Sequence, residues 1–337
     1  MLAGNSHRRI PIAASVLSAT LLGCVCLCGA ELPPLFPDVA LGEAESRLAR
    51  AFVESPGDVA VMRAYASVTE DLSLRRALMA RLERATVYET PLETVFGPAG
   101  EEMGAGIRVT IGGRTLLLLV DTGATGITVG RNKVIGLTDG TAARLEGFGG
   151  GVSGRASMAP SVLAAGLELG PAAVVELDRP FPGGIDGVIG AEVFGAYRVR
   201  LDYRRRAMRL SHDGGGAMEG WTKVERHGDL LFVRSKRGPL LLDTGAAMSV
   251  AADGGSAGGV APAARGVDGK PIAAAVAGFA CMQVDGTRLC DARTVAMDLS
   301  ELGRRAGIRP AGLIGYGALR GRVLEIDYRG GWVRFGD

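Results

Sequence analysis

The chain carries the same acidic turn twice, each time at the end of a short apolar run. Asp121-Thr122-Gly123 follows the apolar residues 116–120, and Asp243-Thr244-Gly245 follows the apolar residues 240–242. Short apolar runs bounded by turn residues are typical of β-strands. A chain that repeats a strand, a tight turn and an aspartate in one order is expected to fold into two related halves.

The similarity between the halves continues downstream. Val188-Ile189-Gly190 and Leu313-Ile314-Gly315 are equivalent segments. Their glycines lie 69 residues after Asp121 (190 − 121) and 72 residues after Asp243 (315 − 243). Two further strand-like segments follow in each half. An internal repeat of this length predicts two homologous lobes.

Composition agrees with a β-rich fold. The 337 residues include 52 glycines and only 5% aromatic residues, which favours tight turns between short strands over helical bundles. The formal net charge of +2 gives no electrostatic footprint for nucleic acid. We expect a mainly β protein with an export segment at 1–30, a helical region at 31–87, and lobes at 88–218 and 219–337.

The region before the first lobe has a helical pattern. Apolar residues recur at helical spacing from Leu41 to Ala85, and Pro56-Gly57 interrupts them before Asp58, which can cap a second helix. The stretch contains no chemical motif. Its role stays open among a prosegment, a spacer that holds the two lobes away from a membrane and one helix pair of a solenoid. The solenoid is least favoured, because a single repeat cannot bury its own face.

The N-terminus has the pattern of an export signal. His7-Arg8-Arg9 precedes the apolar stretch 12–22, which is short for a bilayer span. Leu21-Leu22-Gly23-Cys24 resembles a bacterial lipobox, in which Cys24 becomes lipidated. Cys28-Gly29-Ala30 offers a rival cleavage site, and an uncleaved anchor is a third alternative. The expected location is the periplasm or cell envelope, with or without a lipid tether to the membrane.

Two cysteines flank an expected hairpin. Asp285-Gly286 between β-prone residues is a strong signal for a two-residue turn. Val284 then faces Thr287 across the turn. Further along the hairpin, Cys281 faces Cys290 at a non-hydrogen-bonded position, where side chains come closest. In an exported protein this placement predicts a disulfide, with two reduced and packed cysteines as the alternative.

The two acidic turns and the two apolar segments that end in glycine carry a family resemblance. From about residue 88 to 337 the chain resembles the two-lobed aspartic peptidases of the pepsin and retropepsin superfamily. The resemblance implies two β-barrel lobes in one chain, and one cleft that hydrolyses a peptide or protein substrate without a cofactor or metal. It implies Asp121 and Asp243 as the catalytic residues of a monomeric endopeptidase. It implies that four residues support the catalytic loops: Thr122, Gly123, Thr244 and Gly245. The two threonines would do so through hydrogen bonds across the lobe interface.

Two aspartates suit peptide hydrolysis without a metal or a covalent nucleophile. Carboxyl groups about 3 Å apart cannot both ionise, so one activates water while the other, protonated, donates to the scissile carbonyl. The pair titrates as a unit, which leaves the proton unassigned between Asp121 and Asp243. Ala124 and Ala246 follow the turns, as in retroviral-type enzymes. Because alanine has no hydroxyl group to stabilise a carboxylate, we expect higher dyad pKa values than in pepsins and activity at less acidic pH.

A Gly-rich segment after the first turn is a candidate flap over the substrate. Gly147-Phe148-Gly149-Gly150-Gly151 lies 26 to 30 residues after Asp121, and glycines suit a lid that opens and closes. Phe148, Gly149 and Gly150 are therefore candidate substrate-binding residues, with an ordinary surface loop as the alternative. The counterpart in the second lobe is 266–269. The flap tyrosine of pepsins has no match, since no tyrosine lies between Asp121 and Tyr197.

Other chemistries find little support in the sequence. The histidines His7, His212 and His227 are not set in a nucleophile motif, and no Cys/His cluster has the spacing of a zinc site. Two alternatives stay open: a catalytically silent peptide-binding module on the same fold, and an obligate homodimer with dyads between chains. We interpret Arg204-Arg205-Arg206 as a solvated turn rather than an anion site.

Overall fold

The structure, a computed structural model, covers both acidic turns and most of their surroundings. The residues that it describes are 41–55, 59–69, 71–85, 87–97, 100–134, 140–147, 150–181, 184–212, 219–252, 264–265 and 270–337. The expected export segment, including Cys24, lies outside the described residues. The chain divides into two compact units, Met1–Met79 and Ala80–Asp337.

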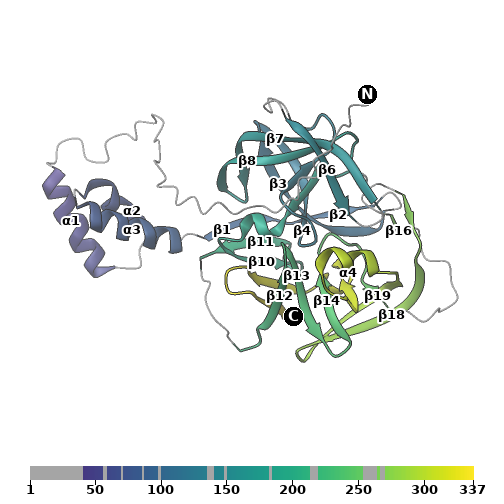
Figure 1. Ribbon diagram of the computed structural model, residues 1–337. Helices are drawn as coiled ribbons and strands as arrows, with labels where there is room; N and C mark the ends of the chain where they lie inside the picture. The colour runs from purple at the N-terminus through teal and green to yellow at the C-terminus, as the bar shows by residue number, and fades with distance from the viewer. Residues whose placement is uncertain are drawn as a thin grey trace, which may run out of the picture. The chain divides into compact units, whose positions relative to one another are not determined.

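Three helices precede the β structure: α1 (Leu41–Glu54), α2 (Val59–Val68) and α3 (Leu72–Ala85) (Figure 1). The rings of Phe52 and Tyr65 pack together with centroids 6.0 Å apart. Asp71 caps α3, because its carboxylate accepts two backbone N–H groups of the first turn at 2.8 and 3.0 Å. Residues 56–58, where the sequence predicts a break, are not among those described. No described helix is long and apolar enough to cross a membrane.

The rest of the described chain is mainly β structure, as the composition predicts (Figure 1). The first half, residues 87–212, contains β1 (Val87–Pro91), β2 (Glu93–Phe96), β3 (Glu102–Ile111), β4 (Arg114–Asp121), β5 (Ile127–Val129), β6 (Thr141–Gly147), β7 (Gly150–Ala164), β8 (Leu167–Leu177), β9 (Gly187–Gly190), the 3-10 helix η1 (Ala191–Phe194), β10 (Arg198–Asp202) and β11 (Ala207–Ser211). The second half, residues 219–337, contains β12 (Thr222–His227), β13 (Leu230–Ser235), β14 (Gly238–Leu242), β15 (Val250–Ala251), β16 (Ala264–Arg265), β17 (Pro271–Ile272), β18 (Ala275–Val284), β19 (Thr287–Ala296), α4 (Ser300–Ala306), β20 (Gly312–Ile314), α5 (Tyr316–Leu319), β21 (Val323–Asp327) and β22 (Trp332–Gly336).

The first half builds one sheet around its acidic turn. The strand order is β2-β3-β4-β9-β5-β8-β7-β6, and pairing of β3 with β7 closes the sheet on itself. β4 runs parallel to β9, while β5 pairs antiparallel with β9 and parallel with β8. Alternate side chains of β3, such as Ile107, Val109 and Ile111, are fully buried in the core.

The second half repeats this pairing pattern. Its strands follow the order β13-β14-β20-β15-β19-β18. β14 runs parallel to β20, and β15 pairs antiparallel with β20 and parallel with β19. The strand that leads to each acidic turn is therefore paired in parallel with the apolar segment that the sequence identified as its partner. The repeat in the sequence is also a repeat in strand order.

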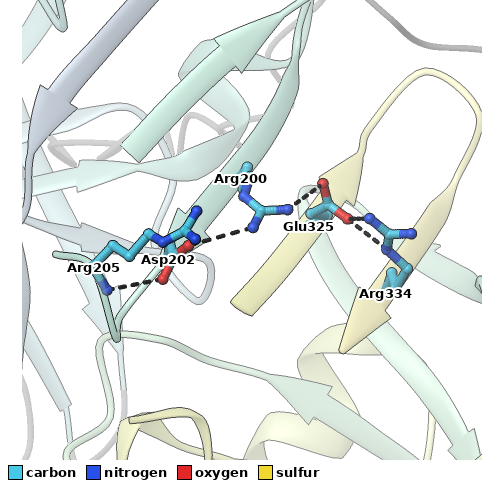
Figure 2. Close-up of polar contacts among 5 residues, drawn as sticks. All are labelled: Arg200, Asp202, Arg205, Glu325 and Arg334. Carbon is cyan, nitrogen blue, oxygen red and sulfur yellow. Dashed lines mark hydrogen bonds and ion pairs between the residues drawn. The ribbon is translucent and has the colours of Figure 1, made fainter. Parts of the chain in front are cut away.

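Six antiparallel strands join the two halves in the order β1-β11-β10-β21-β22-β12. On one face of this central sheet Leu201 lies opposite Leu324 in the core. The other face carries charges: Figure 2 shows Arg200 between Asp202 and Glu325, with Arg334 on the far side of Glu325. Both acids are only 6% exposed, so the arginines compensate charges that are costly to bury alone.

The β18–β19 hairpin has the register expected from the sequence. Asp285 and Gly286 form the turn with φ values of 39° and 84°, and Val284 lies opposite Thr287. Cys281 lies opposite Cys290, and their sulfur atoms are bonded at 2.08 Å. The predicted disulfide is confirmed.

Candidate active site

Each acidic turn is held from behind by a buried parallel strand. β4 ends at Asp121, which lies opposite Gly190 of β9. In the second half, the N–H of Asp243 donates to the carbonyl of Ile314 in β20 at 3.0 Å. Apolar strands of this kind are typical of parallel pairs covered on both faces. Both turns therefore lie at the inner ends of buried strands.

Thr122 and Thr244 bind each other's turns reciprocally. The N–H of Thr122 donates to Oγ1 of Thr244, and the N–H of Thr244 donates to Oγ1 of Thr122, both at 3.0 Å. Each hydroxyl group also donates across the interface, from Thr122 to the carbonyl of Leu242 at 2.7 Å and from Thr244 to that of Val120 at 2.8 Å. The two threonines are 2% and 1% exposed. Four buried hydrogen bonds thus fix one turn against the other.

Gly123 and Gly245 allow the two turns to approach closely. A Cβ atom on Gly123 would lie 2.6 Å from the carboxyl carbon of Asp243, and a Cβ atom on Gly245 would lie 2.2 Å from that of Asp121. Each glycine therefore faces the aspartate of the other half. Any larger residue would displace that carboxyl group.

Backbone N–H groups converge on both carboxyl groups. Gly123 donates to Oδ1 of Asp121 at 2.7 Å. Gly245 and Ala246 donate to Oδ1 of Asp243 at 3.1 and 3.0 Å. The two carboxyl groups also lie close enough for each to influence the pKa of the other. The structure thus brings the two acids into one paired-carboxyl site.

The environment favours a shared proton. Burial raises the pKa of Asp121 and of Asp243, and the negative charge of Asp121 raises the pKa of Asp243 further. Hydrogen bonds from the backbone oppose the rise at both groups. Because two like charges held close together oppose each other's ionisation, the raised pKa values favour a state in which the pair holds one proton. The site can therefore present a carboxylate as base beside a carboxylic acid as proton donor.

Glu192 is a third carboxyl group near the first turn, and the sequence motifs did not single it out. It lies in η1, and its Oε1 accepts a hydrogen bond from the N–H of Gly126 at 2.5 Å. Burial raises the pKa of Glu192 to about 7; the bond to Gly126 opposes the rise, and the charges of Asp229 and Asp121 add to it. The available signal was a single acid in the otherwise uncharged segment 188–194.

In the second half, the carboxylate that supports the acidic turn comes from strand β19, and not from the helical turn that would correspond to η1. The equivalent of Glu192 in this half is Gly317, where a Cβ atom would lie 2.3 Å from Oδ2 of Asp291 in β19. Asp291 is 3% exposed and accepts the N–H of Ser249 at 2.8 Å. Oγ of Ser249 in turn accepts the N–H of Gly315 at 3.2 Å. Each half therefore has an acid that accepts a backbone N–H from the segment after its turn: the partly buried Glu192 in the first half and the buried Asp291 in the second. The two acids come from different places in the sequence.

The candidate flap coincides with the hairpin of β6 and β7. Gly147 faces Gly150 next to its tip. Phe148 and Gly149 lie outside the described residues, as does the counterpart 266–269 in the second half. The contact of this hairpin with a substrate therefore stays a prediction.

An exposed ion pair joins the β6–β7 hairpin to the second half. Oε2 of Glu146 in β6 lies 3.4 Å from a guanidinium nitrogen of Arg305 in α4. Arg305 also pairs with Glu301 of its own helix at 2.7 Å. This ion pair thereby links the hairpin to α4 of the half that contains Asp243.

Of the predicted site residues, the structure brings together Asp121, Thr122, Gly123, Asp243, Thr244 and Gly245. Cys281 and Cys290 lie apart from them on the β18–β19 hairpin. In the part of the chain that is described, no group of three or more His, Cys, Asp or Glu side chains is placed to hold a metal ion. The functional interpretation rests on these residues and their geometry, because no protein-family model and no curated protein matches the chain.

Proposed function

We propose that this protein is an aspartic endopeptidase with two homologous retropepsin-like lobes in one chain. The catalytic groups are Asp121 and Asp243. The observation that carries the proposal is the close pair of interacting carboxyl groups, each of which faces a glycine of the other half. The closed sheet of the first half and the matching strand order of the second are consistent with two such lobes.

The mechanism follows from the shared proton. The ionised carboxylate accepts a proton from a water molecule, whose oxygen adds to the scissile carbonyl carbon. The protonated carboxyl group donates its proton to the carbonyl oxygen at the same time, which gives a neutral tetrahedral diol. The carbon–nitrogen bond then breaks as the nitrogen takes a proton from one carboxyl group and a diol hydroxyl returns one to the other. The dyad ends with the single proton it began with.

Two observations weigh against the alternatives. A homodimer with dyads between chains is unnecessary, because Asp121 and Asp243 pair within one compact unit. Burial raises the pKa values of both acids and costs the fold stability. A catalytic site uses such acids for proton transfer, whereas a silent peptide-binding module would carry the same cost and gain nothing from it. We further propose an exported enzyme that acts on peptides or proteins of the cell envelope, with Cys24 as its candidate lipid attachment.

The test is cleavage of a mixed peptide library by the wild-type protein and by Asp121→Asn and Asp243→Asn, from about pH 3 to pH 8 around the carboxyl reference values. Both variants should lose all cleavage. Asp178→Asn is the matched control, because Asp178 is exposed on the first half. Unchanged cleavage by either dyad variant would contradict the proposal. Cleavage restored on mixing the two inactive variants would instead indicate dyads between chains.

The pH dependence follows from the direction of the pKa shifts. A raised dyad pKa keeps the one-proton form populated to higher pH, and neither Ala124 nor Ala246 supplies a hydroxyl group to lower it. Activity is therefore expected at weakly acidic to near-neutral pH. A profile that peaks below about pH 3, under the reference carboxyl value of about 4, would contradict this expectation.

A further inference from the structure

A small polar cavity opens between the two halves, and no residue of the acidic turns lines it. It lies beside the second turn, because the N–H of Tyr316 in its lining donates to the carbonyl of Ala246 at 2.8 Å. Its volume is about 290 Å³, at the lower end of the range for ligand pockets. Residues of the first half line it together with residues around α5 of the second half: Thr94, Glu102, Tyr203, Arg206, Tyr316, Arg320 and Gly321. Two arginines against one glutamate give the lining a net charge of +1 (2 − 1). The cavity therefore has the size and charge for a small anion.

Two tyrosine hydroxyl groups in the cavity have no protein partner. The rings of Tyr203 and Tyr316 meet edge to face, with centroids 5.5 Å apart. Tyr316 is 5% exposed, and neither hydroxyl group is hydrogen-bonded to another described residue. Burial raises the pKa of both phenols, so both keep their protons at neutral pH. Neither hydroxyl oxygen is among the buried polar atoms that lack a partner, so both are open to the cavity. Each can therefore donate to an acceptor bound there.

The two arginines leave their charge largely available. Arg206 forms no ion pair with any described residue, and Arg320 only approaches Glu102, at 3.8 Å. Such guanidinium groups bind carboxylate and phosphate oxygens through paired N–H donors.

The turn that carries Arg206 is fixed by its backbone. Figure 2 shows Asp202 accepting the N–H of Arg205 at 2.9 Å. The carbonyl of Arg206 accepts the N–H of Leu92 at 2.9 Å, and Arg206 itself has φ of 53°. Because these bonds fix the backbone at Arg205 and Arg206 before a ligand arrives, less conformational entropy is lost when the ligand binds.

We propose that this cavity is a binding site for a small oxyanion, a phosphate or carboxylate group held by Arg206, Arg320 and the hydroxyl groups of Tyr203 and Tyr316. The Arg204-Arg205-Arg206 run is an exposed turn, as the sequence predicts. The proposal gives Arg206 a binding role in addition. The site lies outside the paired-carboxyl site, and its occupancy does not depend on the peptidase proposal.

The experiment is calorimetric titration of the purified protein with inorganic phosphate, and separately with acetate, at constant ionic strength set with sodium chloride. Arg206→Gln should weaken phosphate binding by about tenfold or more, because it removes a charge-assisted hydrogen bond. Arg204→Gln removes the same charge from the same turn but outside the cavity lining, and should bind as the wild type does. Tyr203→Phe deletes one hydroxyl group only and should weaken binding with the fold intact, as circular dichroism will check.

The outcomes separate the interpretations. Tighter binding of phosphate than acetate assigns the site to phosphate groups, and equal binding assigns it to carboxylates such as a peptide C-terminus; both support an oxyanion site. Absence of binding at about 10 mM phosphate would overturn it. Equal weakening by Arg204→Gln and Arg206→Gln, or no effect of Tyr203→Phe, would also overturn it. None of these readouts requires catalysis, so they cannot be confused with failure of the proposed activity.

Discussion

The two halves of the β-rich part of the chain, residues 87–212 and 219–337, are alike at the interface between their acidic turns and differ in the side chains that support each turn from behind. Thr122 and Thr244 exchange equivalent hydrogen bonds, and each turn has a parallel strand behind it. Behind the turns the devices differ, with Glu192 bound to the loop after Asp121, and Ser249 with Asp291 in the second half. What both halves share is the part that sets the carboxyl geometry. The supporting residues, which the halves do not share, can adjust the loop behind each turn separately.

The largest effect is expected from the glycines that face the opposite aspartate. Gly123→Ala and Gly245→Ala should each reduce kcat/KM by about a hundredfold or more, because each methyl group would displace a carboxyl group that we propose to be catalytic. Gly245→Ala should be the more damaging, since its Cβ would lie 2.2 Å from the carboxyl carbon rather than 2.6 Å. Gly336→Ala is the control, because its Cβ would make ordinary contact at 3.5 Å. A Gly245→Ala variant with wild-type activity would contradict the close approach of the two turns at this glycine.

The threonines test the symmetry of the interface. Thr122→Val and Thr244→Val should each lower the free energy of unfolding by about 2 to 4 kcal/mol, because each removes two buried hydrogen bonds and leaves their partners unsatisfied. Thr122→Ser and Thr244→Ser keep the hydroxyl group and serve as controls. Urea unfolding measures all four. Losses that differ by more than about 1 kcal/mol would show that the reciprocal bonds are not equivalent.

Glu192 tests the asymmetry between the halves. Its pKa rises from 4.5 to about 7 on folding, so the unfolded chain loses this proton first and wild-type stability falls as pH rises between those values. Glu192→Gln keeps an acceptor for Gly126 but cannot ionise. Its stability relative to wild type should therefore grow from about pH 4.5 and level off above pH 7, by roughly 3 kcal/mol.

Urea unfolding at a series of pH values measures this difference. Glu168→Gln, which removes an exposed carboxyl group on β8, is the control for general charge effects. A stability difference between Glu192→Gln and wild type that is the same at every pH would contradict the raised pKa.

The smallest effect is expected at the ion pair between the β6–β7 hairpin and α4. Both side chains are exposed, Arg305 at 39% and Glu146 at 46%, and exposed pairs contribute less than about 1 kcal/mol. A double-mutant cycle with Arg305→Ala and Glu146→Ala should give a coupling below that value, and added salt should remove it. A larger, salt-resistant coupling would mean that this link helps to hold the halves together.

Much of this comparison was readable in the sequence because it rests on local repeats. The Asp-Thr-Gly turns, the segments that end at Gly190 and Gly315, and the Cys281–Cys290 register all follow from spacing and turn chemistry. The roles of Glu192 and Asp291 do not, because each depends on a contact with a loop more than forty residues away, 66 for Glu192 and 42 for Asp291. The cavity at Arg206 was also beyond reach, since it needs Tyr316 from the other half.

The most direct measurement is a carbon-13 NMR titration of the carboxyl groups of Asp121 and Asp243. If the turns form one site, both signals should respond together in two widely separated steps, with the one-proton state spanning the pH range between them. In Asp243→Asn, the Asp121 signal should change to a single step. Two independent titrations close to the reference value of about 4 in the wild-type protein would contradict a shared proton, and with it the paired-carboxyl site.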